Sequence, residues 1–231
     1  MKRVCIHQPD FIPYLGFFHR LLISDLFIVL DDVPISKPRG WTHRDKIKTP
    51  FGERWLTLPI QKHPLQKINE VRLGKDGKWE KEHLNLLKEY YQKAPYFDLY
   101  FPKVQDIYHT SDDKLSEFNM AFLRLFCELL GLKIETVFSS SLRVPGNKNE
   151  KLILLIKAVG GTHYLSGVGA KDYLDEPMFA KEGIAVEWQE FIHPVYPQLH
   201  GNFIPNLSTI DLLFNCGPGA KEILQSCLNG K

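Results

Sequence analysis

The sequence predicts an α/β fold, namely a three-layer sandwich with a mostly parallel sheet. Short β-branched runs alternate with amphipathic segments at both ends of the chain, and a helical stretch lies between them. Neighbouring parallel strands need a long crossover, which the intervening helical segments supply. A small β-hairpin and a helical insert between strands two and three complete the predicted fold, which we interpret as a single domain over residues 1–231.

The first unit is a strand, a helix and a second strand. Residues 3–6 (RVCI) and 26–30 (LFIVL) are apolar runs bounded by turn residues, as expected of buried strands. Residues 16–24 (GFFHRLLIS) place aromatic and leucine side chains at helical spacing. A long loop rich in Pro, Gly and basic residues is predicted over 31–53, and functional segments are common in such loops. Residues 54–60 and 68–74 are predicted to pair as a hairpin or as strands of a small sheet.

The middle and the end of the chain continue the pattern. Amphipathic periodicity predicts helices over 78–92, 100–109 and 113–131, with Gly131 as the C-terminal stop of the last. The remaining predicted elements are strands over 133–140, 162–167 and 184–191, and helices over 148–161 and 208–215. Prolines exclude a helix from 193–207.

Composition excludes several classes of protein. Lys and Arg total 29 against 27 Asp and Glu, so the net charge of +2 gives no general reason to expect nucleic acid as a partner. The four cysteines form no C-x-x-C pair, which argues against a zinc ribbon. We expect no metal site, no signal peptide and no membrane span, because residues 1–11 reach a proline early and no run approaches eighteen apolar residues. A soluble, cytoplasmic protein is the expectation.

Polar clusters follow the predicted strands, and ligands of open parallel sheets bind beyond the carboxyl ends of the strands. His7 and Gln8 leave the first strand in a proline-stiffened turn, for which a ligand site and a purely structural turn are about equally supported. Asp31 and Asp32 end the second strand. Adjacent strand residues point to opposite faces, so at most one of the two faces a given site. A substrate-orienting role for Asp32 and a structural one are both open.

Two further loops are candidates for phosphate binding. Lys37, Arg39 and Arg44 lie around Trp41, and Arg suits phosphate while Trp suits stacking on a base or sugar. The alternative is an ordinary solvated basic loop. After the fourth strand, residues 166–173 (SGVGAKDY) form a glycine-rich turn without the Walker or dinucleotide spacing. Its candidate ligand-binding residues are Ser166, Gly167 and Lys171.

The last loop, 193–208, carries His193, Tyr196 and Gln198 on a stiff, proline-rich segment. Stiffening is useful where side chains must be held in place before a ligand arrives. His193 is the candidate general base. The spacing shows no set of three or four zinc ligands.

Taken together, these stretches resemble the WbqC-like family of bacterial proteins associated with surface-polysaccharide and O-antigen biosynthesis. The resemblance lies in IHQPDFIPYLGFFHRL, DLFIVLDDVPISK, RDKIK, WLTLPI, YLSGVGAKDYLD and HPVYPQLHGNFIPNLSTIDLLFNCG, and it spans nearly the whole chain. Asp10, Pro34 and His43 depart from the family pattern, in which Asn, Gln and Asn are expected. The first strand–loop–helix unit is also distantly similar to nucleotidyltransferase-type adenylate-forming enzymes, without their paired histidine signature.

The resemblance implies an enzyme that acts on an amino sugar. The leading hypothesis is an acyl or aminoacyl transferase, or an AMP-forming amide ligase, with His193, His7 and Asp32 as catalytic residues. Its partners would be a nucleotide-linked amino sugar and an acyl donor, and the cofactor stays open between ATP with magnesium and a donor activated elsewhere. The alternative is a non-catalytic carbohydrate- or nucleotide-binding module. A nucleic-acid-binding role is the third hypothesis, supported only by the basic loop. The oligomeric state stays open.

Overall fold

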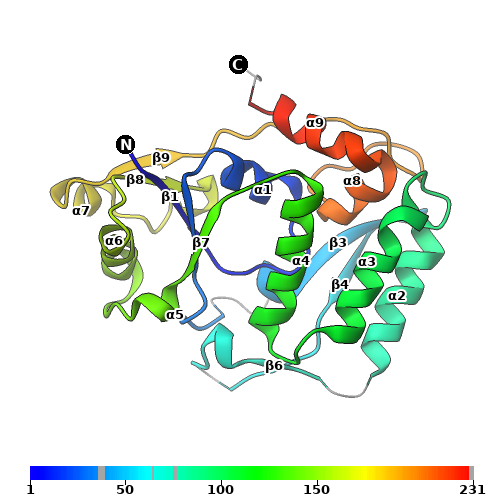
Figure 1. The fold of residues 1–231 in the computed structure, drawn as a ribbon, viewed down its shortest axis with the longest axis horizontal. Helices are drawn as coiled ribbons and strands as arrows, with labels where there is room; N and C mark the ends of the chain where they lie inside the picture. The colour runs from blue at the N-terminus through cyan, green and yellow to red at the C-terminus, as the bar shows by residue number, and fades with distance from the viewer. Residues whose placement is uncertain (36–39, 64, 75–76, 229–231) are drawn as a thin grey trace.

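Five parallel strands form the central sheet of the computed structural model, which describes residues 1–35, 40–63, 65–74 and 77–228 (Figure 1). The strand order is β7-β2-β1-β8-β9. The bounds of these strands are β1 Arg3–His7, β2 Leu26–Val29, β7 Glu135–Phe138, β8 His163–Ser166 and β9 Ala185–Trp188. All four pairings between neighbours are parallel, so the predicted parallel sheet is confirmed.

Helices cover both faces of the sheet. Along β1 and β2 successive side chains alternate between two apolar clusters: Cys5 packs on the face of α1 and α4, whereas Val4 and Ile6 pack against α6 and α7. The helices are α1 Leu15–Leu22, α2 Lys78–Tyr91, α3 Phe97–Thr110, α4 Leu115–Leu129, α5 Ser139–Leu142, α6 Lys148–Ala158, α7 Glu176–Lys181, α8 Thr209–Cys216 and α9 Ala220–Ser226. The three-layer prediction is therefore confirmed, including the insert of hairpins and helices between the second and third strands of the sheet.

The insert begins with a hairpin that the sequence only partly predicts. Strand β3 (Arg44–Thr49) pairs with β4 (Gly52–Thr57), and β5 (Ile60–Gln61) pairs with β6 (Arg72–Leu73). The second pair joins the end of the predicted segment 54–60 to 68–74, but most of 54–60 belongs to β4 and pairs with β3 instead. Strand β3 itself lies inside the predicted loop 31–53. Its sequence is polar, yet Asp45 and Lys48 are buried in it, which conceals the strand from a search for apolar alternation.

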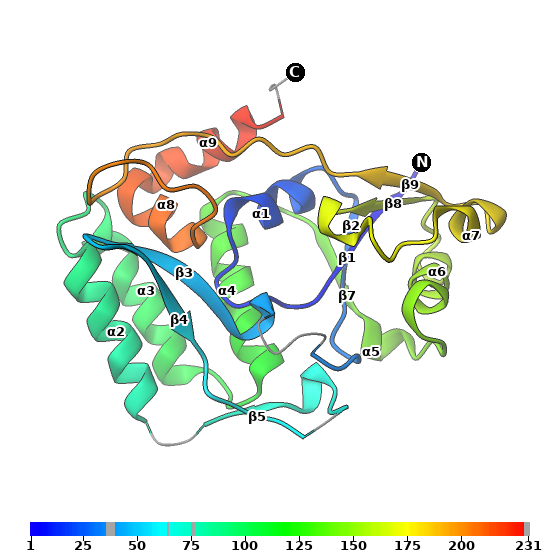
Figure 2. The same cartoon turned by 180° about the vertical axis from the view of Figure 1, so that it is seen from behind.

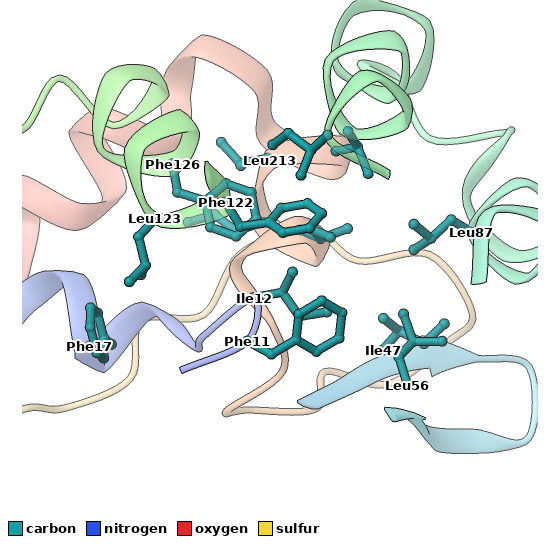
Figure 3. Packing of buried hydrophobic residues seen from close by; sticks show 14 of the residues in the cluster. Phe11, Ile12, Phe17, Ile47, Leu56, Leu87, Phe122, Leu123, Phe126 and Leu213 are labelled. Carbon is teal, nitrogen blue, oxygen red and sulfur yellow. The ribbon is translucent and has the colours of Figure 1, made fainter. Parts of the chain in front are cut away.

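The larger apolar core lies between α1, the three insert helices, α8 and the β3–β4 hairpin (Figure 2). Phe11 and Ile12, from the loop after β1, point into this core. They lie between Ile47 and Leu56 of the hairpin and Phe122 of α4 (Figure 3). Burial of these two large side chains, which lie between Asp10 and Pro13, fixes the course of this loop, because each buried side chain is worth about 1.5–3 kcal/mol.

One smaller difference and one agreement concern the helices. The helix predicted over 100–109 is longer, because α3 starts at Phe97 and contains Pro102. Gly131 has a φ of +66° directly after α4, as its predicted stop role requires. Within the described part of the chain, we find no helix whose length and apolarity would let it cross a membrane.

Candidate functional site

The strand order of the sheet reverses between β1 and β8, so the candidate site lies at the carboxyl ends of these two strands. β1 is the central strand, with β2 and β7 on one side of it and β8 and β9 on the other. The chain therefore leaves β1 toward one edge and returns later to pair on its opposite side. In open α/β sheets such a reversal of strand order is where ligands bind.

His7 ends β1 at this position. Its Nδ1 lies 3.0 Å from the backbone oxygen of Gln8 and 3.4 Å from Oδ2 of Asp10. A carbonyl oxygen only accepts hydrogen bonds, so Nδ1 carries the hydrogen and Nε2 carries the lone pair. Burial, and then the positive charge of Arg20, lower the pKa of His7 to about 3, so the ring is neutral near pH 7. Because 31% of the side chain is exposed, the ring is accessible to a ligand.

Asp10 lies behind His7 and is almost fully buried, with 6% of the residue exposed. Thr42 Oγ1 lies 3.4 Å from its Oδ1. Burial raises the pKa of Asp10 to about 7, although Arg20 and the Thr42 hydroxyl act in the opposite direction. Either carboxyl state can accept the Nδ1 hydrogen of His7, and an asparagine oxygen at this position could do the same. The departure from the family's expected Asn therefore preserves the contact that orients His7.

Arg20 of α1 lies beside the reversal of strand order. Only 7% of the residue is exposed, and within the described ranges its Nε has no hydrogen-bond partner and its guanidinium forms no ion pair. A Cβ atom on Gly167, just beyond β8, would lie 2.6 Å from Arg20 Nη1. The guanidinium thus lies against the backbone that follows β8, and its charge influences the pKa of His7 and Asp10 beside β1.

Two loops are held together over this site. Thr42 Oγ1 donates to Oε1 of Gln8 at 2.8 Å. Nδ2 of Asn119, a fully buried residue of α4, donates to the backbone oxygens of Pro9 and Thr42, both at 2.7 Å. We refer to His7, Gln8, Asp10, Arg20 and Thr42 as the switch-point cluster.

The acidic pair after β2 has a different environment. The Asp31 carboxylate accepts hydrogen bonds from the side chains of Ser139, Ser140 and Asn69, and from the Ser140 amide. Asp32 pairs with Lys151 of α6 at 2.7 Å. Burial opposes ionisation of Asp32, but hydrogen bonds from Lys151 and Ser139 outweigh it and lower the pKa. Both carboxylates are engaged in joining β2 to α5 and α6, and this engagement favours the structural alternative.

Two cavities lie away from the switch-point cluster. One of about 550 Å³ lies between α1, α4 and β7, with Leu21, Phe27 and Leu123 in its lining. The other, of about 500 Å³, lies beside Asp31 and is lined by Asn69, Lys114 and Ser140 among others. Neither is lined by a member of the cluster.

The basic loop is only partly described, because Lys37 and Arg39 lie outside the described residues. Trp41 is 45% exposed and packs against Trp55, with ring centroids 5.4 Å apart. The Arg44 guanidinium lies 4.1 Å from the centroid of the Trp55 ring. Trp41 also accepts a backbone hydrogen bond from Phe11, which places this predicted stacking residue next to the loop after β1.

The glycine-rich turn after β8 also borders the site. Ser166 is buried at the end of β8, and Gly167 contacts Arg20 as described above. Lys171 lies farther along the turn, with its Nζ 5.4 Å from the centre of the Trp188 ring. Of the predicted residues, His7, Gln8 and Gly167 are thus brought together by the fold.

The residues predicted from the last loop lie elsewhere. His193 packs among the rings of Phe191, Tyr196 and Phe203, and its Nδ1 lies 2.9 Å from the backbone oxygen of Pro194. Burial lowers the pKa of His193.

The other two side chains of this loop are engaged in a buried network. Tyr196 donates to Asp211 of α8, and Oε1 of Gln198 accepts from Nζ of the buried Lys48. These contacts fasten the last loop to the β3–β4 hairpin and α8, and none of the three predicted side chains has a described contact with the switch-point cluster.

Three residues of the cluster, Asp10, Arg20 and Thr42, were not singled out from the sequence as site residues. Arg20 reads there as a polar residue on an amphipathic helix, and Asp10 as part of a turn. Only the meeting of β1 with β8 gives them significance. Nowhere in the described ranges do three His, Cys, Asp or Glu side chains converge as a metal site would require.

Comparison with known proteins identifies the family. The model of the WbqC-like protein family matches residues 8–223. The chain belongs to the WbqC-like protein family. A similar relative is the uncharacterized protein Rv1507c of Mycobacterium tuberculosis, with 35% identity over 98% of this chain and 99% of the relative. No solved structure is significantly similar. The family is linked to polysaccharide biosynthesis, and the switch-point cluster lies within the part of this WbqC-like chain that the family model matches, apart from His7 directly before it.

Proposed function

We propose that this WbqC-like protein is a transferase that forms an amide on an amino sugar in polysaccharide biosynthesis. The observation that supports this most directly is the His7 ring, which is neutral near pH 7 and held with its Nε2 lone pair available where the strand order reverses. A neutral imidazole whose Nε2 lone pair is available can take a proton from an attacking amine.

The proposed step needs no covalent enzyme intermediate. The amine nitrogen of the sugar attacks the acyl carbon of the donor, and a new N–C bond forms. The bond between that carbon and the leaving group breaks, and the leaving group departs with the electron pair. Nε2 of His7 takes the amine proton and later releases it, while Asp10 holds the ring through Nδ1. The sequence has no Gly-x-Ser-x-Gly nucleophile motif, consistent with direct transfer.

The structure favours His7 over His193 for this role. His193 lies among the rings of Phe191, Tyr196 and Phe203 and has no described contact with Arg20 or Asp10. His7 lies between a carboxyl group that orients it and a cation that can hold an anionic substrate. An Asp beside a His supports acid–base chemistry by fixing the tautomer and orientation of the imidazole.

The test is an amide-forming assay with a His7→Gln variant. Purified protein is incubated with nucleotide-linked amino sugars and two sets of donors, acyl-coenzyme A species and amino acids with ATP and magnesium, and products are detected by mass spectrometry. We expect His7→Gln to lower kcat about 10²–10⁴-fold with little change in KM, because general-base catalysis contributes that much. His109→Gln, on the exposed surface of α3, is the control and should retain activity.

Other results would contradict the proposal. If nucleotide-linked sugars bind but no donor yields product, the protein is the non-catalytic binding module. If His7→Gln weakens binding while kcat is kept, His7 is a ligand-binding residue and the base lies elsewhere.

A further inference from the structure

Arg20 is a buried cation that forms no ion pair within the part of the chain that the structure describes. Its guanidinium makes no ion pair, and Nε has no hydrogen-bond acceptor, among the residues that the structure describes. Taking a guanidinium out of water without a partner costs several kcal/mol, and a buried donor without an acceptor is rare in native proteins. A feature this costly calls for a ligand that supplies the acceptors.

Among the described residues, no carboxylate beside Arg20 forms an ion pair with it. Its charge influences the pKa of several groups, of which Asp10 is the carboxylic acid; the others are Cys5, His7, Tyr14, His19, Tyr164 and Tyr173. Asp10 contacts His7 and Thr42 instead. Cys5 and Tyr164 come from β1 and β8, so these neighbours also place the guanidinium at the reversal of strand order.

The backbone after β8 makes room for Arg20. Gly167 has no side chain, and a Cβ atom there would lie 2.6 Å from Nη1, closer than any normal contact. Gly169, two residues on, has open space around the same hypothetical atom. Gly167 is therefore needed to accommodate the guanidinium, whereas Gly169 is not. Alanine substitutions at the two positions distinguish an effect on Arg20 from a general effect on the flexibility of the turn.

We propose that Arg20, with the Gly167 backbone beside it, binds a phosphate group of the substrate. The planar guanidinium presents paired N–H donors that match two oxygens of a phosphate. The position fits, because dinucleotide and mononucleotide phosphates bind at the switch point of open α/β sheets. This inference rests on the proposed function and narrows its substrate to a phosphate-bearing one, such as a nucleotide diphosphate sugar, with the diphosphate at Arg20 and the reacting amine near His7.

Calorimetric titration with three probes tests the site directly: pyrophosphate, a uridine diphosphate amino sugar, and acetate as a carboxylate. We expect the full-length protein to bind the first two and acetate far more weakly. Arg20→Gln should lower the affinity for pyrophosphate and for the uridine diphosphate amino sugar about 10–100-fold, because charged hydrogen bonds to the phosphate are lost. Arg124→Gln, which removes an exposed arginine of α4, should leave them unchanged.

The two glycines give a second, independent arm in case Arg20→Gln folds poorly. Gly167→Ala should weaken the phosphate probes at least tenfold, because the methyl group displaces Nη1. Gly169→Ala should change the affinity for the phosphate probes less than twofold. Equal effects of the two alanines, unchanged affinity in Arg20→Gln, or no binding of any phosphate probe would overturn the inference. Acetate binding that equals pyrophosphate binding would overturn the assignment to phosphate.

Failure of this inference and failure of the proposed function give different results. If amide formation proceeds with unchanged KM in Arg20→Gln and Gly167→Ala, the phosphate site is wrong while the transferase stands. If phosphate probes bind in an Arg20-dependent manner and no donor yields product, the phosphate site stands while the transferase is wrong.

Discussion

At the residue scale, Asp10 is a buried carboxyl group whose protonation changes near neutral pH. Burial raises its pKa to about 7, whereas a carboxyl group in the unfolded chain titrates near 3.8. Between these values the folded protein keeps a proton that the unfolded chain releases. The stability contributed by Asp10 is therefore fully present below about pH 4 and is lost as the pH rises toward 7.

Replacement of Asp10 by Asn should remove this pH dependence. The amide cannot ionise, so its folded state has no buried charge to accommodate at high pH. Relative to the unchanged protein, Asp10→Asn should gain about 2 kcal/mol of stability between pH 5 and pH 8. Urea unfolding at the two pH values measures the gain. Asp106→Asn, on the exposed surface of α3, is the control, and an equal pH response of the two variants would contradict the buried state of Asp10.

At the element scale, α4 fixes the two loops that carry Gln8, Asp10 and Thr42 of the switch-point cluster. Its residue Asn119 is fully buried and donates to a backbone oxygen of each loop. This single side chain connects the insert between β2 and β7 with the first strand of the sheet. The insert therefore helps to hold the loop after β1 in place.

Asn119→Ala should leave both carbonyl oxygens unsatisfied. We expect a loss of about 2–6 kcal/mol in the free energy of unfolding, from two buried acceptors at about 1–3 kcal/mol each. The released loop should also lower kcat of the proposed amide-forming reaction, because the loop begins directly after His7 and carries Asp10, which orients the His7 ring. Chemical denaturation is the measurement, with Asn85→Ala on the exposed side of α2 as the control. A loss below 0.5 kcal/mol would show that other contacts hold the loops.

The elements that the sequence predicts correctly are those with apolar patterns. The apolar runs 3–6 and 26–30 predict two buried strands, and the amphipathic periodicity of 113–131 predicts a helix, because burial and sequence pattern agree there. Strand β3 was missed because Asp45 and Lys48 are buried in spite of their charge. Lys48 reaches carbonyl oxygens of the last loop, and such long-range partners leave no trace in local sequence.

The candidate site is predicted less completely than the fold. His7, Gln8 and Gly167 follow from the rule that strand ends carry ligands. Arg20 does not, because its importance comes from the pairing of β1 with β8, which are about 160 residues apart in the chain. His193, Tyr196 and Gln198 have the right chemistry for a site, yet their described contacts are those of a packed loop.

At the scale of the whole molecule, one sheet and one charge distribution define where a ligand binds. Net charge is only +2, so attraction of an anionic substrate depends on a local cation more than on the overall field. The order β7-β2-β1-β8-β9 places that cation beside the neutral base. The proposed role of His7 as the base requires a neutral ring with its lone pair on Nε2.

Nitrogen-15 chemical shifts of the His7 ring test this state most directly. Spectra of labelled protein are recorded from pH 5 to pH 8, and the His7→Gln variant assigns the His7 signals. Our account predicts a neutral ring throughout, with the hydrogen on Nδ1 and an unprotonated Nε2. An imidazolium at pH 6–7, or the hydrogen on Nε2, would contradict it and remove His7 as the base.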